Sequence, residues 1–257
     1  MSLQEQWVAF LTILRKEIKR FTRIWVQTLL PPAITMILYF VIFGKLIGSR
    51  IGEMAGFSYI EFVAPGLIMM AVITNAYANV SSSFFSAKFQ RSIEELLVSP
   101  TPNYIILLGY VMGGVARGMA VGLIVTVMSL FFTDLSIHHW GTTLFIVFMT
   151  SVLFSLAGFI NAIYANTFDD VSIIPTFVLT PLTYFGGVFY SIHLLPEFWQ
   201  QVSILNPILH MVNGFRYGML GTSDVHIGAA LIGLSVFVVI LFMVAMHLLK
   251  TGKRLRA

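Results

Sequence analysis

Six long apolar runs, separated by short polar segments, take up most of this chain of 257 residues. Hydrophobic residues make up 58% of the sequence and charged residues only 10%, whereas a soluble domain carries about 25% charged residues. So much apolar surface cannot be kept from water, and we predict an all-α, polytopic membrane protein without a separate soluble domain. The transmembrane helices are expected over residues 24–43, 62–83, 104–132, 144–164, 171–190 and 227–249.

The N-terminal segment, residues 1–23, has the periodicity of an amphipathic helix. A basic helix with an aromatic-rich face is typical of a helix that lies along a membrane surface. The alternative is a soluble helix packed on a partner, which we disfavour because a membrane span follows directly. The expected apolar face consists of Trp7, Phe10, Leu11, Leu14, Ile18 and Phe21.

The distribution of basic residues predicts the topology. With six spans both termini lie on one side of the membrane, and 11 of the 15 Lys and Arg residues then fall on that side, against three on the other. Positively charged residues remain in the cytoplasm, so we expect cytoplasmic termini, including a basic tail over residues 251–257. The net charge of +4 therefore reflects topology, and we expect no nucleic-acid partner.

The stretch 88–102, between the second and third spans, combines charge with a helical apolar stripe. Phe89, Ile93, Leu96 and Leu97 recur at helical spacing, and Pro100 and Pro102 then stop the helix. The topology places this short helix on the cytoplasmic side. Periodicity alone favours an interfacial loop helix, and the alternative is a docking helix for a soluble partner.

Several polar side chains lie inside the predicted spans. Asn75, Asn79 and Ser82 share one face of the second span, where we favour hydrogen bonding between helices over a substrate site. Arg117 lies well inside the third span and is a functional candidate, because a buried charge in a membrane is expensive. A tilted helix that brings Arg117 beside a structural carboxylate is an equally good explanation.

Prolines interrupt two of the spans, and a half-polar region precedes the last one. Pro31 and Pro32 predict a kink or local unwinding in the first span, and Pro175 and Pro181 interrupt the fifth. Residues 191–221 are too polar for a lipid-facing span and too apolar for a free loop. We therefore predict a re-entrant pair of short helices, buried in protein.

Three motifs resemble those of one family. They are Arg91-Ser-Ile-Glu94-Glu-Leu-Leu-Val-Ser-Pro100, Phe62-Val-Ala-Pro65-Gly66 at the start of the second span, and Leu205-Asn206-Pro207 followed by Arg216. Each motif resembles a segment of ABC-2 type transport permeases, and the resemblance covers nearly the whole chain, with residues 24–250 as the transmembrane domain. It implies the membrane half of an ATP-driven transporter, usually an exporter, in a bacterial inner membrane.

The resemblance also implies partners and sites. Two permease copies pair with two separate ATPase subunits, which hold the ATP and Mg²⁺, so no cofactor, metal or catalytic residue is expected in this chain. The ATPase-coupling residues implied are Phe89, Arg91, Ile93, Glu94, Glu95, Leu96, Leu97 and Pro100. The candidates for the translocation path, which spans 1, 2 and 5 of both copies line, are Asn75, Asn79, Arg117, Pro181 and Phe185. The hairpin that caps the outer end contains Asn206, Pro207 and Arg216.

Absent motifs weigh against other functions. The sequence lacks the Gly-x-x-x-x-Gly-Lys-Ser/Thr phosphate loop, so ATP hydrolysis must come from a partner chain. An ion-coupled secondary transporter, the main alternative, needs carboxylates at mid-membrane, whereas the acids here lie in loops or at span ends. Asp169 and Asp170 are adjacent and do not face each other on a helix, which makes a poor catalytic pair. An amphiphilic, lipid-like or glycan substrate stays open.

Overall fold

The computed structural model of the chain describes residues 1–252, apart from the side chain of Lys45, and these are almost entirely helical. The predicted basic tail lies outside the described residues beyond Gly252. Within the described part, five single or composite helices are long and apolar enough to cross a membrane. They are the composite α2–α4 (Trp25–Ile51), α5 (Tyr59–Phe89), α7 (Asn103–Ser129), α8 (Trp140–Tyr164) and α13 (Ile227–Thr251).

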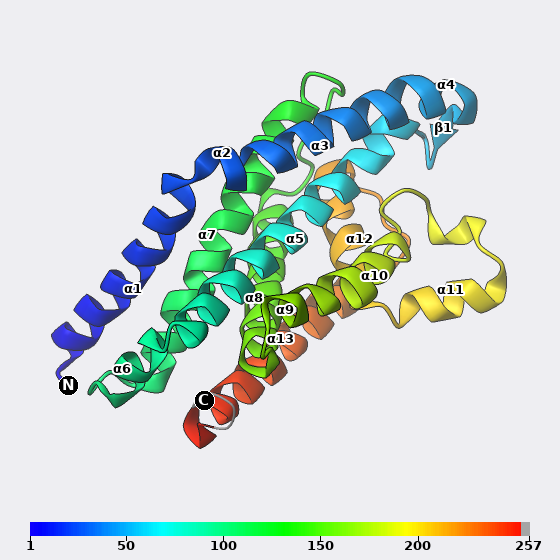
Figure 1. Cartoon of the computed structure of the whole chain (residues 1–257). Coiled ribbons are helices and arrows are strands. Elements are labelled where there is room, and N and C mark those ends of the chain that lie inside the picture. The colour runs from blue at the N-terminus through cyan, green and yellow to red at the C-terminus, as the bar shows by residue number, and fades with distance from the viewer. Residues whose placement is uncertain (253–257) are drawn as a thin grey trace.

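Both described ends of the chain lie at the same end of an elongated bundle (Figure 1). The start of α1 (Leu3–Arg23) and the end of α13 are found there, together with the short α6 (Ser92–Val98). At the opposite end lie α4 (Gly48–Ile51) and α11 (Glu197–Ile204). An even number of membrane crossings produces this arrangement, while the count of six stays a prediction.

The first apolar run is a broken helix followed by a small β-hairpin. Its pieces are α2 (Trp25–Thr28), α3 (Leu30–Val41), the π-helix η1 (Ile42–Ile47) and α4. Pro31 and Pro32 occupy the first turn of α3, where a missing N–H removes no helical hydrogen bond, so the helix breaks just before them. The antiparallel strands β1 (Glu53–Met54) and β2 (Phe57–Ser58) follow, so the all-α prediction is corrected to nearly all-α.

The predicted fifth span, residues 171–190, is not one helix. It consists of α9 (Phe168–Ile174), the π-helix η2 (Pro175–Leu179) and α10 (Thr180–Tyr184). Pro175 and Pro181 each lack an N–H, so the regular helical hydrogen bonds cannot run through these positions. The chain then turns at Gly187, whose φ of +67° is in the left-handed region that favours glycine.

Helix α5 is the centre of the bundle, and 78% of its most apolar 18-residue segment is buried. It packs against α7 and α8, and small residues allow these helices to approach closely. A Cβ added to Gly158 of α8 would lie only 2.5 Å from the backbone oxygen of Tyr77 on α5. On α7, a Cβ added to Gly118 would lie 3.0 Å from the Cβ of Ala76. The glycines of α7 therefore allow close helix packing.

Helix α1 docks on α7 through a face that differs from the predicted one. Its buried residues are Ile13, Glu17 and Phe21, and of these only Phe21 belongs to the predicted apolar face. Ile13 and Glu17 lie over two glycines of α7, since a Cβ on Gly109 would meet Ile13 and one on Gly113 would meet Glu17. The rest of the predicted face stays partly or largely exposed, Trp7 at 60%, and is free to contact lipid.

The contact between α5 and α8 can be tested with two alanine substitutions in the same helix. We expect Gly158→Ala to destabilise the protein by about 1–3 kcal/mol, because the added methyl group meets backbone that cannot give way. Gly141→Ala is the matched control, since no atom lies within 4 Å of an added Cβ there. Thermal unfolding in detergent should show a lower Tm for Gly158→Ala alone; equal Tm values would contradict this packing.

Candidate functional site

The predicted cytoplasmic helix over residues 88–102 is wrong in its boundaries. Helix α5 continues through Lys88 to Phe89, the chain turns at Gln90 and Arg91, and α6 covers only Ser92–Val98. Arg91 has a φ of +59°, a left-handed conformation that non-glycine residues rarely adopt. This turn separates Phe89 from the other apolar residues of the predicted stripe.

The turn also changes which residues face outward. Ile93 is only 1% exposed and packs in the protein's own core, and Leu96 and Leu97 pack partly against the same core. Phe89 and Val98, by contrast, are 63% and 83% exposed. The outward surface, called the α6 surface below, consists of Phe89, Arg91, Glu95, Val98 and Pro100. Of the other predicted coupling residues, Glu94 is half-buried.

The α6 surface is tied to the neighbouring turn between α8 and α9. The Lys88 Nζ donates hydrogen bonds to the carbonyl oxygens of Ile163 (2.6 Å) and Ala165 (2.8 Å) at the end of α8. A positive charge there also offsets the negative end of the helix dipole. The ring of Phe168 packs on that of Phe89, with centroids 5.1 Å apart. Lys88 therefore links the turn after α5 to the turn between α8 and α9.

Of the two adjacent acids in this turn, Asp170 alone takes part in the cap of helix α9. The Asp170 carboxylate accepts hydrogen bonds from the backbone N–H groups of Asn166 (2.8 Å) and Thr167 (3.1 Å), and the Thr167 hydroxyl accepts one from the Asp170 N–H. These bonds to the charged form lower the pKa of Asp170. Asp169 is exposed and makes no part of the cap.

An ion pair within α1, between buried Glu17 and half-buried Arg20, is hydrogen-bonded to α5, and hydropathy and periodicity did not predict it. Glu17 is fully buried, accepts a hydrogen bond from the Ser83 hydroxyl (2.7 Å), and lies 3.5 Å from the Arg20 Nε. The Arg20 Nη2 donates to the backbone and side-chain oxygens of Asn79, both at 2.8 Å. The available signal was an acid three residues before a base on the helix face that carries Ile13 and Phe21.

Arg117 makes a similar link to Asn75, which lies one turn before Asn79 on α5. Its Nη2 donates to the side-chain oxygen of Asn75 (3.0 Å) and to the carbonyl oxygen of Thr28 (3.2 Å), so it joins α7, α5 and α2. No carboxylate is among these partners. Asn75 and Asn79 are 5% and 0% exposed and hold arginines between helices, so neither lines an open surface.

The open face of α5 carries a different set of side chains. Residues four apart are at least partly exposed along it, namely Met70, Thr74, Ala78, Ser82 and Ser86. In Figure 1 this helix runs in front, with α3 on one side and α10 on the other. Tyr39, Thr74 and Tyr184 are among the residues around a hollow of about 210 Å³ on this face. The predicted path residues Pro181 and Phe185 are exposed on or beside α10.

At the end of the bundle opposite to the chain termini, Arg216 is the hub of a buried network. Its guanidinium donates to the carbonyl oxygens of Phe62 (3.2 Å) and Gly187 (2.6 Å) and to the Asn213 side chain (3.2 Å). It also lies 3.9 Å from the centroid of the Phe62 ring, a cation–π contact. Arg216 thus joins α12 (Pro207–Leu220) to the start of α5 and to the turn after α10.

Asn206 and Pro207 fix the start of α12. The Asn206 side-chain oxygen caps the helix by accepting from the Ile208 N–H (2.9 Å), and its Nδ2 donates to the Leu182 carbonyl of α10 (2.6 Å). Pro207 occupies the first helical position. Of the predicted hairpin, α12 is largely buried, while α11 exposes Phe198, Trp199 and Val202.

Among the described residues, no group of three acids or histidines is arranged to hold a metal ion.

Comparisons with known proteins agree on one family. The ABC-2 type transporter family matches residues 8–220. The chain is 61% identical, over 251 residues and 98% of both chains, to the inner membrane transport permease YadH of Escherichia coli (strain K12). It is 22% identical to nodulation protein J of Rhizobium meliloti (strain 1021), over 95% of this chain and 92% of that protein.

The Arg216 network can be tested with the conservative change Arg216→Lys. A lysine keeps the charge but cannot donate in three fixed directions, and hydrogen bonds to charged groups contribute about 1.5–3 kcal/mol each. We expect a lower Tm and faster proteolysis near α11. Leu194→Ala is the control, because that side chain is 67% exposed. Wild-type stability of Arg216→Lys would argue against a hub role.

Proposed function

The chain belongs to the ABC-2 type transporter family, and on this premise we propose that it is the membrane-spanning subunit of an ATP-binding cassette exporter. It is a transport permease and a subunit without catalytic residues of its own. A separate ATPase, holding ATP and Mg²⁺, is proposed to dock on the cytoplasmic turn 88–102. The observation that carries this proposal is the exposed α6 surface at the end of the most buried helix.

The α6 surface has the chemistry of a protein contact. Phe89 and Val98 offer exposed apolar area, and Arg91 and Glu95 place one charge of each sign beside them. A hollow of about 390 Å³, lined in part by Lys16, Ser92 and Glu95, lies between α1 and α6. An ATPase helix that enters this hollow would contact both elements.

Helix α5 connects this surface to the outer end of the protein. It is a single helix of 31 residues, which spans about 46 Å at 1.5 Å per residue. Its outer end provides the Phe62 carbonyl to Arg216, and its cytoplasmic end carries Phe89. We propose that movement of α6 upon ATPase closure reaches the outer hairpin of α11 and α12 through this one rigid element.

The open face of α5 supports a path between two copies of the chain. It combines hydroxyl groups, such as Thr74 and Ser82, with the apolar and aromatic groups of Met70, Tyr39 and Tyr184. Mixed walls of this kind suit an amphiphilic, lipid-like or glycan substrate. The path would run between α3, α5 and α10 of both copies in a homodimer, together with two ATPase subunits.

An ion-coupled mechanism is the alternative, and Glu17 is the residue that would serve it. This carboxylate is fully buried between α1 and α5, where it accepts a hydrogen bond from Ser83 and pairs with Arg20. It does not reach the open face of α5. A mobile proton site on the path would need a different position. Collapse of the proton gradient in vesicles should leave transport unchanged under the ATPase mechanism and abolish it under the alternative.

The docking of the ATPase can be tested with Val98→Asp, in complex with the partner ABC ATPase of this permease. Burying a valine contributes about 1.5–3 kcal/mol, so a charge there should weaken co-purification at least about tenfold. The fold should stay intact, because Val98 is 83% exposed. Leu194→Asp is the matched control at the opposite end, at 67% exposure. Normal co-purification of Val98→Asp would exclude the α6 surface as the docking site.

The proposed topology can be tested by thiol labelling, because the chain contains no cysteine. We expect a membrane-impermeant maleimide applied from outside to label Glu197→Cys, at the exposed start of α11, in intact inner-membrane spheroplasts. Ser2→Cys should react only after the membrane is opened. The reverse pattern would require an inverted protein and would place the α6 surface outside the reach of a cytoplasmic ATPase.

A further inference from the structure

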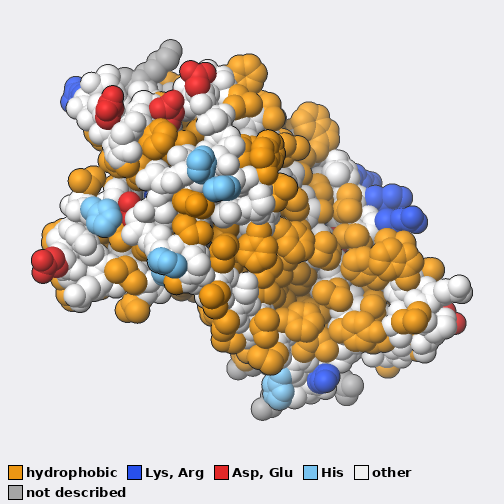
Figure 2. Space-filling model, turned by 180° about the vertical axis from the view of Figure 1, so that it is seen from behind, with side chains coloured by type: hydrophobic (Ala, Val, Ile, Leu, Met, Phe, Trp, Pro, Cys, Tyr) orange, Lys and Arg blue, Asp and Glu red, His pale blue; other side chains and the backbone are white. Residues whose placement is uncertain are grey.

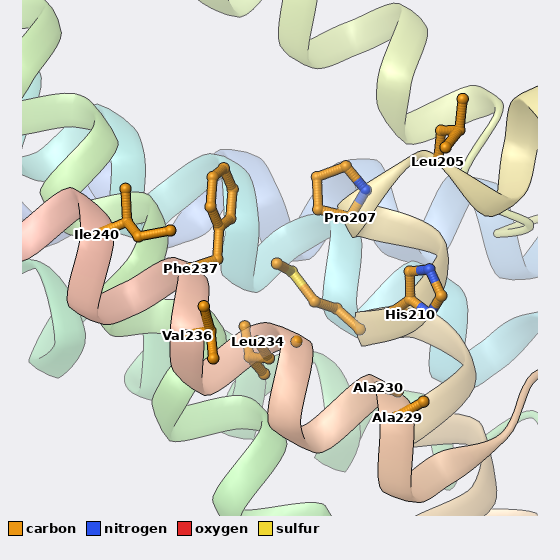
Figure 3. Close-up of a pocket in the computed structure, with 11 residues that line it drawn as sticks. Leu205, Pro207, His210, Ala229, Ala230, Leu234, Val236, Phe237 and Ile240 are labelled. Atoms are coloured by element: carbon orange, nitrogen blue, oxygen red, sulfur yellow. The ribbon is translucent and has the colours of Figure 1, made fainter.

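An elongated apolar groove lies between α12 and α13 and includes Pro207 at the start of α12 (Figure 3). Its volume is about 350 Å³. One wall includes Pro207, His210 and Met211 of α12, and the other includes Gly233, Phe237 and Ile240 of α13. This volume is near the lower end of the roughly 300–1,000 Å³ typical of ligand pockets, which suits a single hydrocarbon chain better than a whole amphiphile.

The wall formed by α13 faces hydrocarbon. Its most apolar 18-residue segment has the highest mean hydropathy of the five candidate spans, 2.8, and only 11% of that segment is buried in the protein. The side of the molecule opposite to the view of Figure 1 is broadly apolar (Figure 2). Val236, Phe237 and Ile240 are all exposed, so the groove opens directly to the membrane interior in a chain of this family.

The two ends of the groove differ in polarity. In Figure 3, His210 lies near Ala229 and Ala230 at one end, and Ile240 lies at the other. Ala229 and Ile240 are about 16 Å apart along the helix at 1.5 Å per residue. The His210 Nε2 lies 2.8 Å from the Ile204 carbonyl oxygen, which can only accept, so Nε2 carries a hydrogen. In the neutral ring Nδ1 is then an acceptor, and it has no partner among the described residues.

Gly233 keeps the middle of the groove open. No atom lies within 4 Å of a Cβ added there, so a larger side chain would enter the groove without a clash. We propose that this groove binds one acyl chain of a membrane phospholipid, with its polar head at His210. Nδ1 is buried in this structure, so the head must reach it through a shift of the His210 ring and present a hydrogen-bond donor, as the ammonium of phosphatidylethanolamine does and the quaternary ammonium of phosphatidylcholine does not.

The occupant can be identified with a phosphatidylethanolamine that carries a photoreactive diazirine in its acyl chain. In nanodiscs, we expect this probe to label the wild-type segment 233–240, as mapped by peptide mass spectrometry. Gly233→Leu should reduce labelling at least fivefold, because leucine fills the groove. Leucine also favours a helix more than glycine does. Gly233→Met, with a flexible side chain, is a second blocking variant, and a wild-type Tm shows that either has folded.

Val239→Leu is the matched control, since Val239 is 55% exposed on α13 and does not line the groove. It should label like the wild type. Equal labelling of both folded blocking variants and the wild type would mean contact with bulk lipid only and would overturn the proposal. A cross-link between α13 segments of two chains would overturn it in favour of a second copy as the occupant.

The role of His210 has its own measurement. Wild-type labelling by the probe should fall when excess unlabelled phosphatidylethanolamine competes, and it should fall much less with excess phosphatidylcholine. In His210→Leu the two competitors should become equivalent, while the acyl chain is still bound. Equal competition by the two lipids in the wild type would exclude His210 as the head-group contact.

Discussion

The close contact of α5 with α7 and α8 is the interaction on which the rest of the structure depends. In a bilayer the hydrophobic effect does not drive helices together, so packing and interhelical hydrogen bonds must do so. Glycines at 118 and 158 let the backbones approach within van der Waals contact of α5. With α5 enclosed in this way, its N-terminal end can hold Arg216 and its C-terminal end can position α6.

Three arginines connect this core to its surroundings, and they do so mostly through neutral acceptors. Arg117 and Arg216 bond to carbonyl and amide oxygens on other elements, and of the three only Arg20 forms an ion pair with a carboxylate, that of Glu17. Such bonds satisfy a buried guanidinium in fixed directions. As a result α1, α5, α7 and α12 are held in one arrangement, which is what a protein needs if it transmits movement from a soluble partner.

The sequence was sufficient for the membrane class, the family and the approximate positions of five apolar helices, because these follow from hydropathy and from contiguous motifs. It was not sufficient for residues 171–190, where prolines break the predicted helix. The sequence did not predict the α6 surface, because the left-handed turn at Arg91 is a single backbone conformation that hydrophobic periodicity does not indicate. For Asn75 and Asn79 the favoured interpretation, hydrogen bonding between helices, is confirmed, but their arginine partners, which lie 42 and 59 residues away in the chain, could not be predicted. Glu17 was missed because a buried acid on a basic helix looks like one more solvated charge.

The central claim is that an ATPase acts on the cytoplasmic end of α5 in a dimer of this chain. The most direct test is a distance measurement between spin labels at Glu95→Cys in the two copies of the complex, which has no native thiol in this subunit. The account predicts a dipolar signal whose distance shortens when ATP and vanadate trap the ATPase in its closed state. A distance that does not change while ATP is hydrolysed, or no dipolar signal at all, would contradict it.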